Sequence, residues 1–218
     1  MADELVFYTN PMSRGRVVRW MLEEVGQPYH TEILDYAMTL KAPAYLAVNP
    51  MGKIPALRHG DTVVTESAAI CAYLADAFPA ARLAPPPGDK LRGPYYRWLF
   101  FAAGPLEYAA TDRALGFAVP PDKERMIGYG RYDLVLDTLE GAVSRGDYLA
   151  GSAFTAADVY VGSHLGFGMQ FGTIEKRPAF ERYWQRLGAR PAAVRARQID
   201  DALMPPKPVP SNAATAGQ

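Results

Sequence analysis

The sequence has very little cysteine, with Cys71 as its single thiol in 218 residues. One thiol excludes an internal disulfide framework and a C-x-x-C redox pair, and it leads us to expect a reducing, cytoplasmic environment. The chain also lacks any run of about eighteen apolar residues, so no membrane-spanning helix is predicted. Its first residues, MADEL, are acidic where a secretory signal would carry Lys or Arg.

Excess charge of either sign is absent as well, because 23 basic residues balance 23 acidic ones. This balance gives no support to a nucleic-acid partner or an anionic membrane, both of which favour a basic surface. The three histidines, His30, His59 and His164, are scattered without the spacing of metal ligands, so no metal site is predicted. The length is sufficient for either one large domain or two small ones, each with its own core.

Strand and helix signals alternate through the first eighty residues. Runs of β-prone residues predict four strands, and apolar residues at helical spacing predict three helices. Gly60-Asp61 is a hairpin turn signal between the last two strands. The order βαβαββα predicts a small mixed sheet flanked by helices. The predicted elements are a strand at 5–9, a helix from Ser13 that stops at Gly26, a strand at 29–34, a short helix at 44–48, strands at 56–59 and 62–65, and a helix at 67–78.

After Pro79 the composition changes. A Pro-rich stretch predicts a stiff linker, and the segments that follow it read as helices, one of which Pro105 is expected to kink. Thr155 and Asp158 form a pattern close to a capping box at the start of another helix. We therefore predict an N-terminal domain at 1–82, a linker at 83–90, an all-helical domain at 91–204 and a flexible, Pro- and Ala-rich tail at 205–218.

Four segments together resemble the cytosolic glutathione transferase family, in its order and spacing, over about residues 4–204. The Pro11-Met-Ser13 turn is similar to bacterial-type members with serine in the turn. The resemblance implies a thioredoxin-like domain that binds glutathione and an all-α domain that holds an apolar electrophile. It also implies a homodimer with a detoxifying transferase activity. The four segments are 7–24, 49–57, 66–74 and 154–158.

The resemblance assigns the peptide contacts of glutathione to two places. Pro55 matches the family's cis-proline, which would turn the backbone of Ile54 outward so that it pairs with glutathione like an added strand. The alternative is an edge strand after an ordinary trans proline. Ser67 would hold the γ-glutamyl carboxylate at a helix N-terminus, and Glu66 would pair with the α-ammonium. Taken alone, these two residues are better explained as an N-cap and a solvated charge, and it is the neighbouring Ile54-Pro55 motif that favours the binding role.

Basic side chains near these positions supply charge. Lys41 and Lys53 resemble family positions that reach the glycyl carboxylate, although solvated lysines are the alternative. Many members carry His where Leu40 stands and Gln where Lys53 stands, and the loss of that His puts part of the contact in doubt. Arg14 and Arg16 add positive potential near the turn, unless they face solvent.

Ser13 is the residue we expect to act on sulfur. Glutathione is a nucleophile as its thiolate, and a hydrogen bond from a serine hydroxyl would stabilise that anion and lower the pKa of the thiol. Serine cannot be the base, because its own pKa is far higher. Tyr8, Thr9 and Asn10 are alternative thiolate contacts, and Ser13 could instead be only a helix cap.

Three functions remain open at this point. The first is a transferase that conjugates glutathione to an apolar electrophile, whose pocket would include a subset of the aromatic residues from Phe101 to Tyr108. The second is a non-catalytic glutathione-binding or regulatory module, against which the retained site residues argue. The third is a glutathione-dependent peroxidase or isomerase, which the missing Ser-rich turn of the family's isomerases disfavours.

Overall fold

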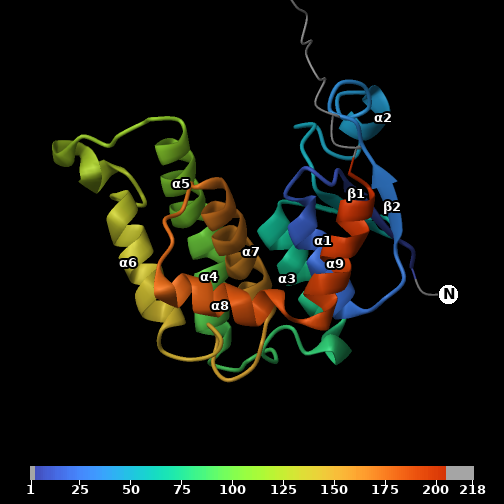
Figure 1. The fold of residues 1–218 in the computed structure, drawn as a ribbon. Helices are drawn as coiled ribbons and strands as arrows, with labels where there is room; N and C mark the ends of the chain where they lie inside the picture. Colours follow the sequence, from blue (N-terminus) through green and yellow to red (C-terminus); the bar gives the residue numbers. More distant parts are fainter. Residues whose placement is uncertain (1–2, 205–218) are drawn as a thin grey trace, which may run out of the picture.

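The computed structural model describes residues 3–204 and contains a four-stranded mixed sheet with the order β2-β1-β3-β4 (Figure 1). Strand β1 (Leu5–Thr9) runs parallel to β2 (His30–Ile33) and antiparallel to β3 (Ala56–His59). The β3 strand pairs antiparallel with β4 (Thr62–Thr65) through the predicted hairpin. The predicted order βαβαββα is confirmed, and the tail predicted to be flexible lies outside the described residues.

Alternating side chains place two cores on the two faces of this sheet, because successive residues of a strand point to opposite faces. Phe7 belongs to the large core, against which helices α1 (Gly15–Val25) and α3 (Ser67–Ala77) pack. Tyr8 points to the other face, where a smaller core forms around the short helix α2 (Pro43–Leu46).

The rest of the described chain is helical. Helices α4 and α5 are joined by a π-helical turn (Ala102–Leu106) that contains Pro105, at the point where a kink was expected. Proline cannot donate a backbone hydrogen bond, and an inserted π-turn accommodates this loss. The helices are α4 (Arg92–Phe101), α5 (Glu107–Ala114), α6 (Tyr132–Val143), α7 (Ala156–Phe171), α8 (Pro178–Gly188) and α9 (Pro191–Ala202), with 3₁₀ turns at Pro79–Ala81 and Pro121–Met126.

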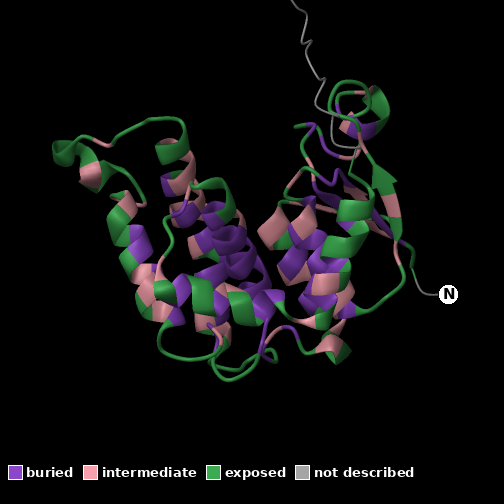
Figure 2. Cartoon of the chain, viewed as in Figure 1, coloured by how far each residue is buried: buried purple, intermediate pink, exposed green. Residues whose placement is uncertain are grey.

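Helix α7 lies at the centre and is buried along most of its length (Figure 2). Its start carries the predicted capping pattern: the Asp158 carboxylate accepts hydrogen bonds from the backbone N–H groups of Thr155 (2.8 Å) and Leu149 (2.9 Å) and from the Tyr183 hydroxyl (2.7 Å). Helix α7 contacts both α1 and α3, so it joins the helical part to the sheet-bearing part. No helix among residues 3–204 is long and apolar enough to cross a membrane.

Candidate functional site

The strand register brings three distant segments to one end of the sheet. Tyr8, near the end of β1, faces Ala56 at the start of β3, and Ala56 also faces Thr65 at the end of β4. The turn after β1 therefore lies at the same end of the sheet as the residues that precede β3 and those that follow β4. Ser13, Ile54-Pro55 and Glu66-Ser67, which the sequence picks out separately, belong to these three segments.

The segment before β3 presents a free backbone edge. The Ile54-Pro55 bond is cis, as predicted. Neither the N–H nor the C=O of Ile54 makes a hydrogen bond with any residue between 3 and 204. The preceding Lys53 carbonyl is held firmly, because it accepts hydrogen bonds from the Tyr45 hydroxyl (2.6 Å) and the Asn49 amide (2.8 Å). A fixed and unpaired peptide of this kind is suited to pair with an extended ligand.

The segment after β4 presents polar groups at a helix N-terminus. Glu66 occupies the N-cap position of α3 with φ 65°, and Ser67 is the first helical residue, so Ser67 is not the cap. Within the described part of the chain, neither side chain makes a hydrogen bond or an ion pair, although Ser67 is half-buried. The first N–H groups of a helix lack intrahelical partners and carry a partial positive charge. This end of α3 can therefore receive a carboxylate.

The two lysines behave differently. The Lys53 side chain is exposed and has no ion-pair partner among residues 3–204. The Lys41 ammonium donates to the carbonyls of Met51 and Gly52, at 2.9 Å in both cases, and Leu40 is buried. Lys41 thus shapes the loop at Gly52, whose φ of 56° suits glycine. Of the two charges, the one on Lys53 is the more available to a ligand.

Ser13 is fully engaged within its turn. Its hydroxyl donates to the Asn10 carbonyl (2.7 Å), and the hydroxyl oxygen accepts from the N–H of Gly15 (2.9 Å), the first residue of α1. The Asn10 carbonyl also accepts from the backbone N–H of Ser13 (3.0 Å). A ligand that accepts a hydrogen bond from the Ser13 hydroxyl must therefore replace the Asn10 carbonyl as the acceptor of the hydroxyl proton. The Asn10 carbonyl then still keeps its hydrogen bond from the backbone N–H of Ser13.

The alternative thiolate contacts, Tyr8, Thr9 and Asn10, differ in exposure and in their partners. Tyr8 packs on Tyr45 on the other face of the sheet, with ring centroids 5.6 Å apart. Thr9 is completely buried. The Asn10 amide donates to the Leu34 carbonyl (2.8 Å), and its side-chain oxygen accepts from the Met12 N–H (2.9 Å). Both polar atoms of the Asn10 side chain thus have partners, as the Ser13 hydroxyl does, so hydrogen bonding within the chain does not separate these two candidates.

An ion pair that local sequence patterns do not reveal crosses from the turn to the helical part. Arg14 pairs with Glu107 at the start of α5, and His164 Nδ1 of α7 lies 3.7 Å from the same carboxylate oxygen. Burial is the main cause that lowers the pKa of His164 to about 4; the charge of Arg14 acts in the same direction and that of Glu107 opposes it. The imidazole is therefore neutral near pH 7. The charge of Arg14 is held beside Ser13 by a partner 93 positions away.

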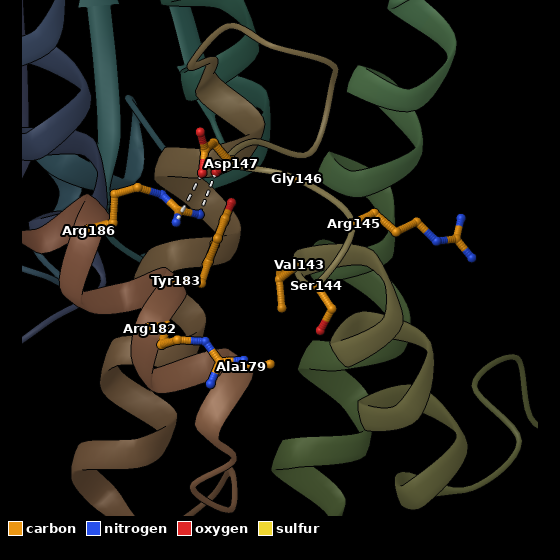
Figure 3. A pocket seen from close by; sticks show the side chains of 9 residues that line it. All are labelled: Val143, Ser144, Arg145, Gly146, Asp147, Ala179, Arg182, Tyr183 and Arg186. Atoms are coloured by element: carbon orange, nitrogen blue, oxygen red, sulfur yellow. Dashed lines mark hydrogen bonds and ion pairs between the residues drawn. The ribbon is translucent and has the colours of Figure 1, made fainter.

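A hollow of about 270 Å³ at the far end of the helical part does not belong to this site (Figure 3). It lies between α8 and the loop that follows α6, and it contains none of the candidate residues. Its arginines do not converge: Arg186 pairs with Asp147 (3.3 Å), while Arg145 points away from the hollow in Figure 3.

Comparison with known proteins agrees with this geometry. Two family models match, "Glutathione S-transferase, N-terminal domain" over residues 7–86 and "Glutathione S-transferase, C-terminal domain" over residues 106–191. Glutathione S-transferase 3 of Zea mays is 31% identical, over 96% of this chain and 99% of its own. A glutathione transferase structure from Methylococcus capsulatus has a TM-score of 0.74 at 30% identity, over 91% of this chain and 99% of that one. A glutathione transferase structure from Phanerochaete chrysosporium, solved in complex with oxidised glutathione, has a TM-score of 0.76 at 30% identity. The match covers 93% of this chain and 98% of that one.

Proposed function

Because the chain belongs to the glutathione S-transferase family, we propose that it binds glutathione and activates its thiol as a thiolate for attack on an apolar electrophile. In this reaction a sulfur–carbon bond forms, the leaving group departs with its electron pair, and the thiol proton passes to solvent. The observation that carries the proposal is the unpaired Ile54 peptide, which lies at the same end of the sheet as the N-terminus of α3 and the Ser13 turn.

The charges around this end of the sheet complement those of glutathione. The peptide part pairs with the N–H and C=O of Ile54 next to Pro55, and the γ-glutamyl carboxylate binds the Ser67 hydroxyl and the N-terminus of α3. Glu66 pairs with the α-ammonium, and Lys53 attracts the glycyl carboxylate. Lys41 contributes mainly by holding the loop at Gly52.

The sulfur lies beside Ser13 in this arrangement. A thiolate is a charged acceptor and forms a stronger hydrogen bond than the neutral Asn10 carbonyl, so it attracts the hydroxyl proton. The oxygen keeps accepting from Gly15, because a hydroxyl donates one proton and accepts through its lone pairs. Stabilising the anion lowers the pKa of the thiol below its ordinary value of about 8.5. Arg14 adds a positive charge near this turn.

The electrophile would bind beside the sulfur, against the exposed apolar side chains of α5 and the segment that follows it. Tyr108 and Phe117 are 62% and 66% exposed, while Phe101 is half-buried. Arg113, whose guanidinium lies 4.2 Å from the centre of the Tyr132 ring, offers a polar contact nearby. This surface favours an apolar second substrate.

The decisive experiment compares Ser13→Ala with wild type by titrating the thiolate absorbance of bound glutathione and by measuring turnover of an aryl halide. We expect the pKa of the bound thiol to rise by about one to two units, because a hydrogen bond to a charged group stabilises it by about 1.5–3 kcal/mol. The matched control is Ser67→Ala, which should raise the Kd for glutathione and leave the thiol pKa unchanged. An unchanged titration and rate in Ser13→Ala would move the role to Tyr8, Thr9 or Asn10.

One observation favours the non-catalytic module as a second candidate, namely that the Ser13 hydroxyl already has partners within its turn. Tight glutathione binding without turnover of aryl halides, hydroperoxides or dehydroascorbate would support that function. Turnover of hydroperoxides or dehydroascorbate alone would support a glutathione-dependent peroxidase or isomerase. We also propose that the protein is a homodimer, which the family resemblance supports. We propose a reducing cytoplasm as its location, which the single thiol supports.

A further inference from the structure

The two ends of the glutathione site differ in how firmly the protein is built around them. The end that receives the γ-glutamyl carboxylate is the N-terminus of α3, a helix of 11 residues whose Ile70 and Leu74 are completely buried. Ser67, at the start of this helix, is half-buried. A carboxylate at such a place meets backbone N–H groups that are fixed by the helix and a hydroxyl that is partly desolvated. Its contacts therefore contribute strongly to affinity.

The opposite end, beside the glycyl carboxylate, is built from two exposed loops. Every residue from 35 to 39 is exposed, and so are Lys41, Met51 and Lys53. Met38 is 74% exposed and Met51 is 67% exposed. Figure 2 shows these loops as largely green ribbon around α2, at the edge of the molecule. A ligand that continues beyond its glycyl group therefore enters solvent rather than the protein.

Lys41 ties the two loops together and is not free to follow a ligand. Its ammonium donates to the carbonyls of Met51 and Gly52, at 2.9 Å in both cases, which uses two of its three N–H groups. A Cβ atom at Gly52 would lie 2.7 Å from this ammonium nitrogen, so the Lys41 side chain packs directly on Gly52. Moving the charge of Lys41 toward a ligand carboxylate would break both hydrogen bonds.

Lys53 is the other cation of these loops, and water screens its charge. Its side chain is exposed and makes no ion pair within the range 3–204. Asp35, in the first of the two loops, carries an opposing charge. An exposed ion pair changes affinity by about fivefold at most, which corresponds to about 1 kcal/mol. The glycyl carboxylate therefore contributes little to binding.

We propose that this site accepts γ-glutamylcysteinyl thiols whose C-terminal end is blocked or extended, as an ester, an amide or a longer peptide, nearly as well as glutathione. Recognition is concentrated on the γ-glutamyl group at α3 and on the cysteinyl peptide that pairs with Ile54. The C-terminal group lies in solvent beyond Lys53. The inference rests on the glutathione-conjugating function proposed above, and it defines the class of thiol that the site takes.

The test compares two analogues that each lack one negative charge of glutathione. Glutathione monoethyl ester, esterified at glycine, should bind with a Kd within about fivefold of that of glutathione. Its matched control, 4-aminobutyryl-Cys-Gly, lacks the γ-glutamyl carboxylate and should bind at least about tenfold more weakly, because Ser67 and the N-terminus of α3 lose their charged ligand. The longer peptide γ-Glu-Cys-Gly-Gly tests size and should also bind within about fivefold. Isothermal titration calorimetry of the full chain gives each Kd, and turnover of an aryl halide with each thiol gives kcat/KM.

The outcomes separate this inference from the function on which it rests. If glutathione binds but the ester or the longer peptide binds more than about fivefold more weakly, the inference is wrong and the proposed function stands. Equal losses of affinity from the two charge-deleted analogues would also overturn the inference alone. If glutathione itself does not bind, both are wrong.

Lysine variants locate the weak contact. Lys53→Gln should raise the Kd for glutathione by up to about fivefold and leave the Kd for the ester unchanged. Lys41→Gln, which removes the hydrogen bonds between the loops, should weaken both ligands by the same factor. Lys90→Gln is the matched control, since Lys90 is exposed and lies outside both loops, and it should change neither Kd. If Lys41→Gln weakens glutathione by more than about fivefold and spares the ester, Lys41 binds the glycyl carboxylate and the inference is refuted.

Discussion

Gly15 offers a sharp test of how the turn at Ser13 is built. An added Cβ atom at this position would lie 1.8 Å from Thr9 Oγ1 and 3.0 Å from Ser13 Oγ. Thr9 is completely buried, so its hydroxyl cannot move into solvent. The end of β1 and the start of α1 approach each other this closely because Gly15 has no side chain. Gly15→Ala must therefore push Thr9, Ser13 or the helix start out of position.

The magnitude follows from two opposing effects. Alanine is more favourable than glycine in a helix by about 1 kcal/mol. Overpacking of a buried site is unfavourable by about 1–3 kcal/mol, and a separation of 1.8 Å from Thr9 Oγ1 belongs at the upper end of that range. We expect a net loss of about 2 kcal/mol. For a chain of this length that loss lowers the Tm by about 4–8 °C, which thermal unfolding followed by circular dichroism measures.

Two variants separate this clash from a general effect of the substitution. Gly141→Ala on α6 is the matched control, because a Cβ atom there meets nothing within 4 Å and the residue is exposed; it should gain up to about 1 kcal/mol. Adding Thr9→Ala to Gly15→Ala removes the clashing hydroxyl and should recover part of the lost stability. If Gly15→Ala melts at or above the wild-type temperature while Gly141→Ala behaves as expected, the packing argument is wrong.

Two further predictions concern buried ionisable groups. Stability should fall as the pH drops from about 6.5 toward about 4, because burial lowers the pKa of folded His164 to about 4 while the unfolded chain takes up a proton at the ordinary value of 6.5. Urea unfolding across this range measures the slope, at most about 1.4 kcal/mol per pH unit from this group, and His164→Gln should flatten it. Asp158→Ala should lower the free energy of unfolding by about 3–5 kcal/mol, because it leaves the buried donors of Thr155, Leu149 and Tyr183 without an acceptor. A change in the urea midpoint of Asp158→Ala equivalent to less than about 1 kcal/mol would contradict that role.

Local signals in the sequence were sufficient to predict much of the fold. The strands at 56–59 and 62–65 have the predicted bounds, because the Gly60-Asp61 turn and the β-prone runs beside it specify both. The first helix begins at Gly15 rather than at Ser13. The reason is that the backbone and side chain of Ser13 both bind the Asn10 carbonyl, so Ser13 belongs to a turn and not to the helix. Cys71, the single thiol of the chain, is completely buried.

Contacts between distant residues could not be predicted in the same way. Arg14 and Glu107 are 93 positions apart, and Arg19 and Asp200 are 181 apart. Helical periodicity assigns a residue to a face of its helix, but it does not say which other helix covers that face. Arg19 illustrates the difficulty, because a basic residue among apolar neighbours on α1 reads as solvent-facing until α9 supplies its carboxylate.

The sequence posed helix cap and thiolate contact as alternative roles for Ser13; the structure places Arg14 at the N-cap, but Ser13 still pairs the first N–H of the helix, and this is compatible with a thiolate contact. Arg14 occupies the N-cap position of α1, and the Ser13 hydroxyl, one residue earlier, uses a lone pair to accept from the N–H of Gly15, the first helical residue. As a thiolate contact, it would use its single proton, which the Asn10 carbonyl accepts in the structure. Because Asn10 keeps the backbone hydrogen bond from Ser13, giving up that proton does not leave its carbonyl unpaired. The Ser13 hydroxyl can therefore keep its hydrogen bond from the Gly15 N–H while it donates its proton to a thiolate.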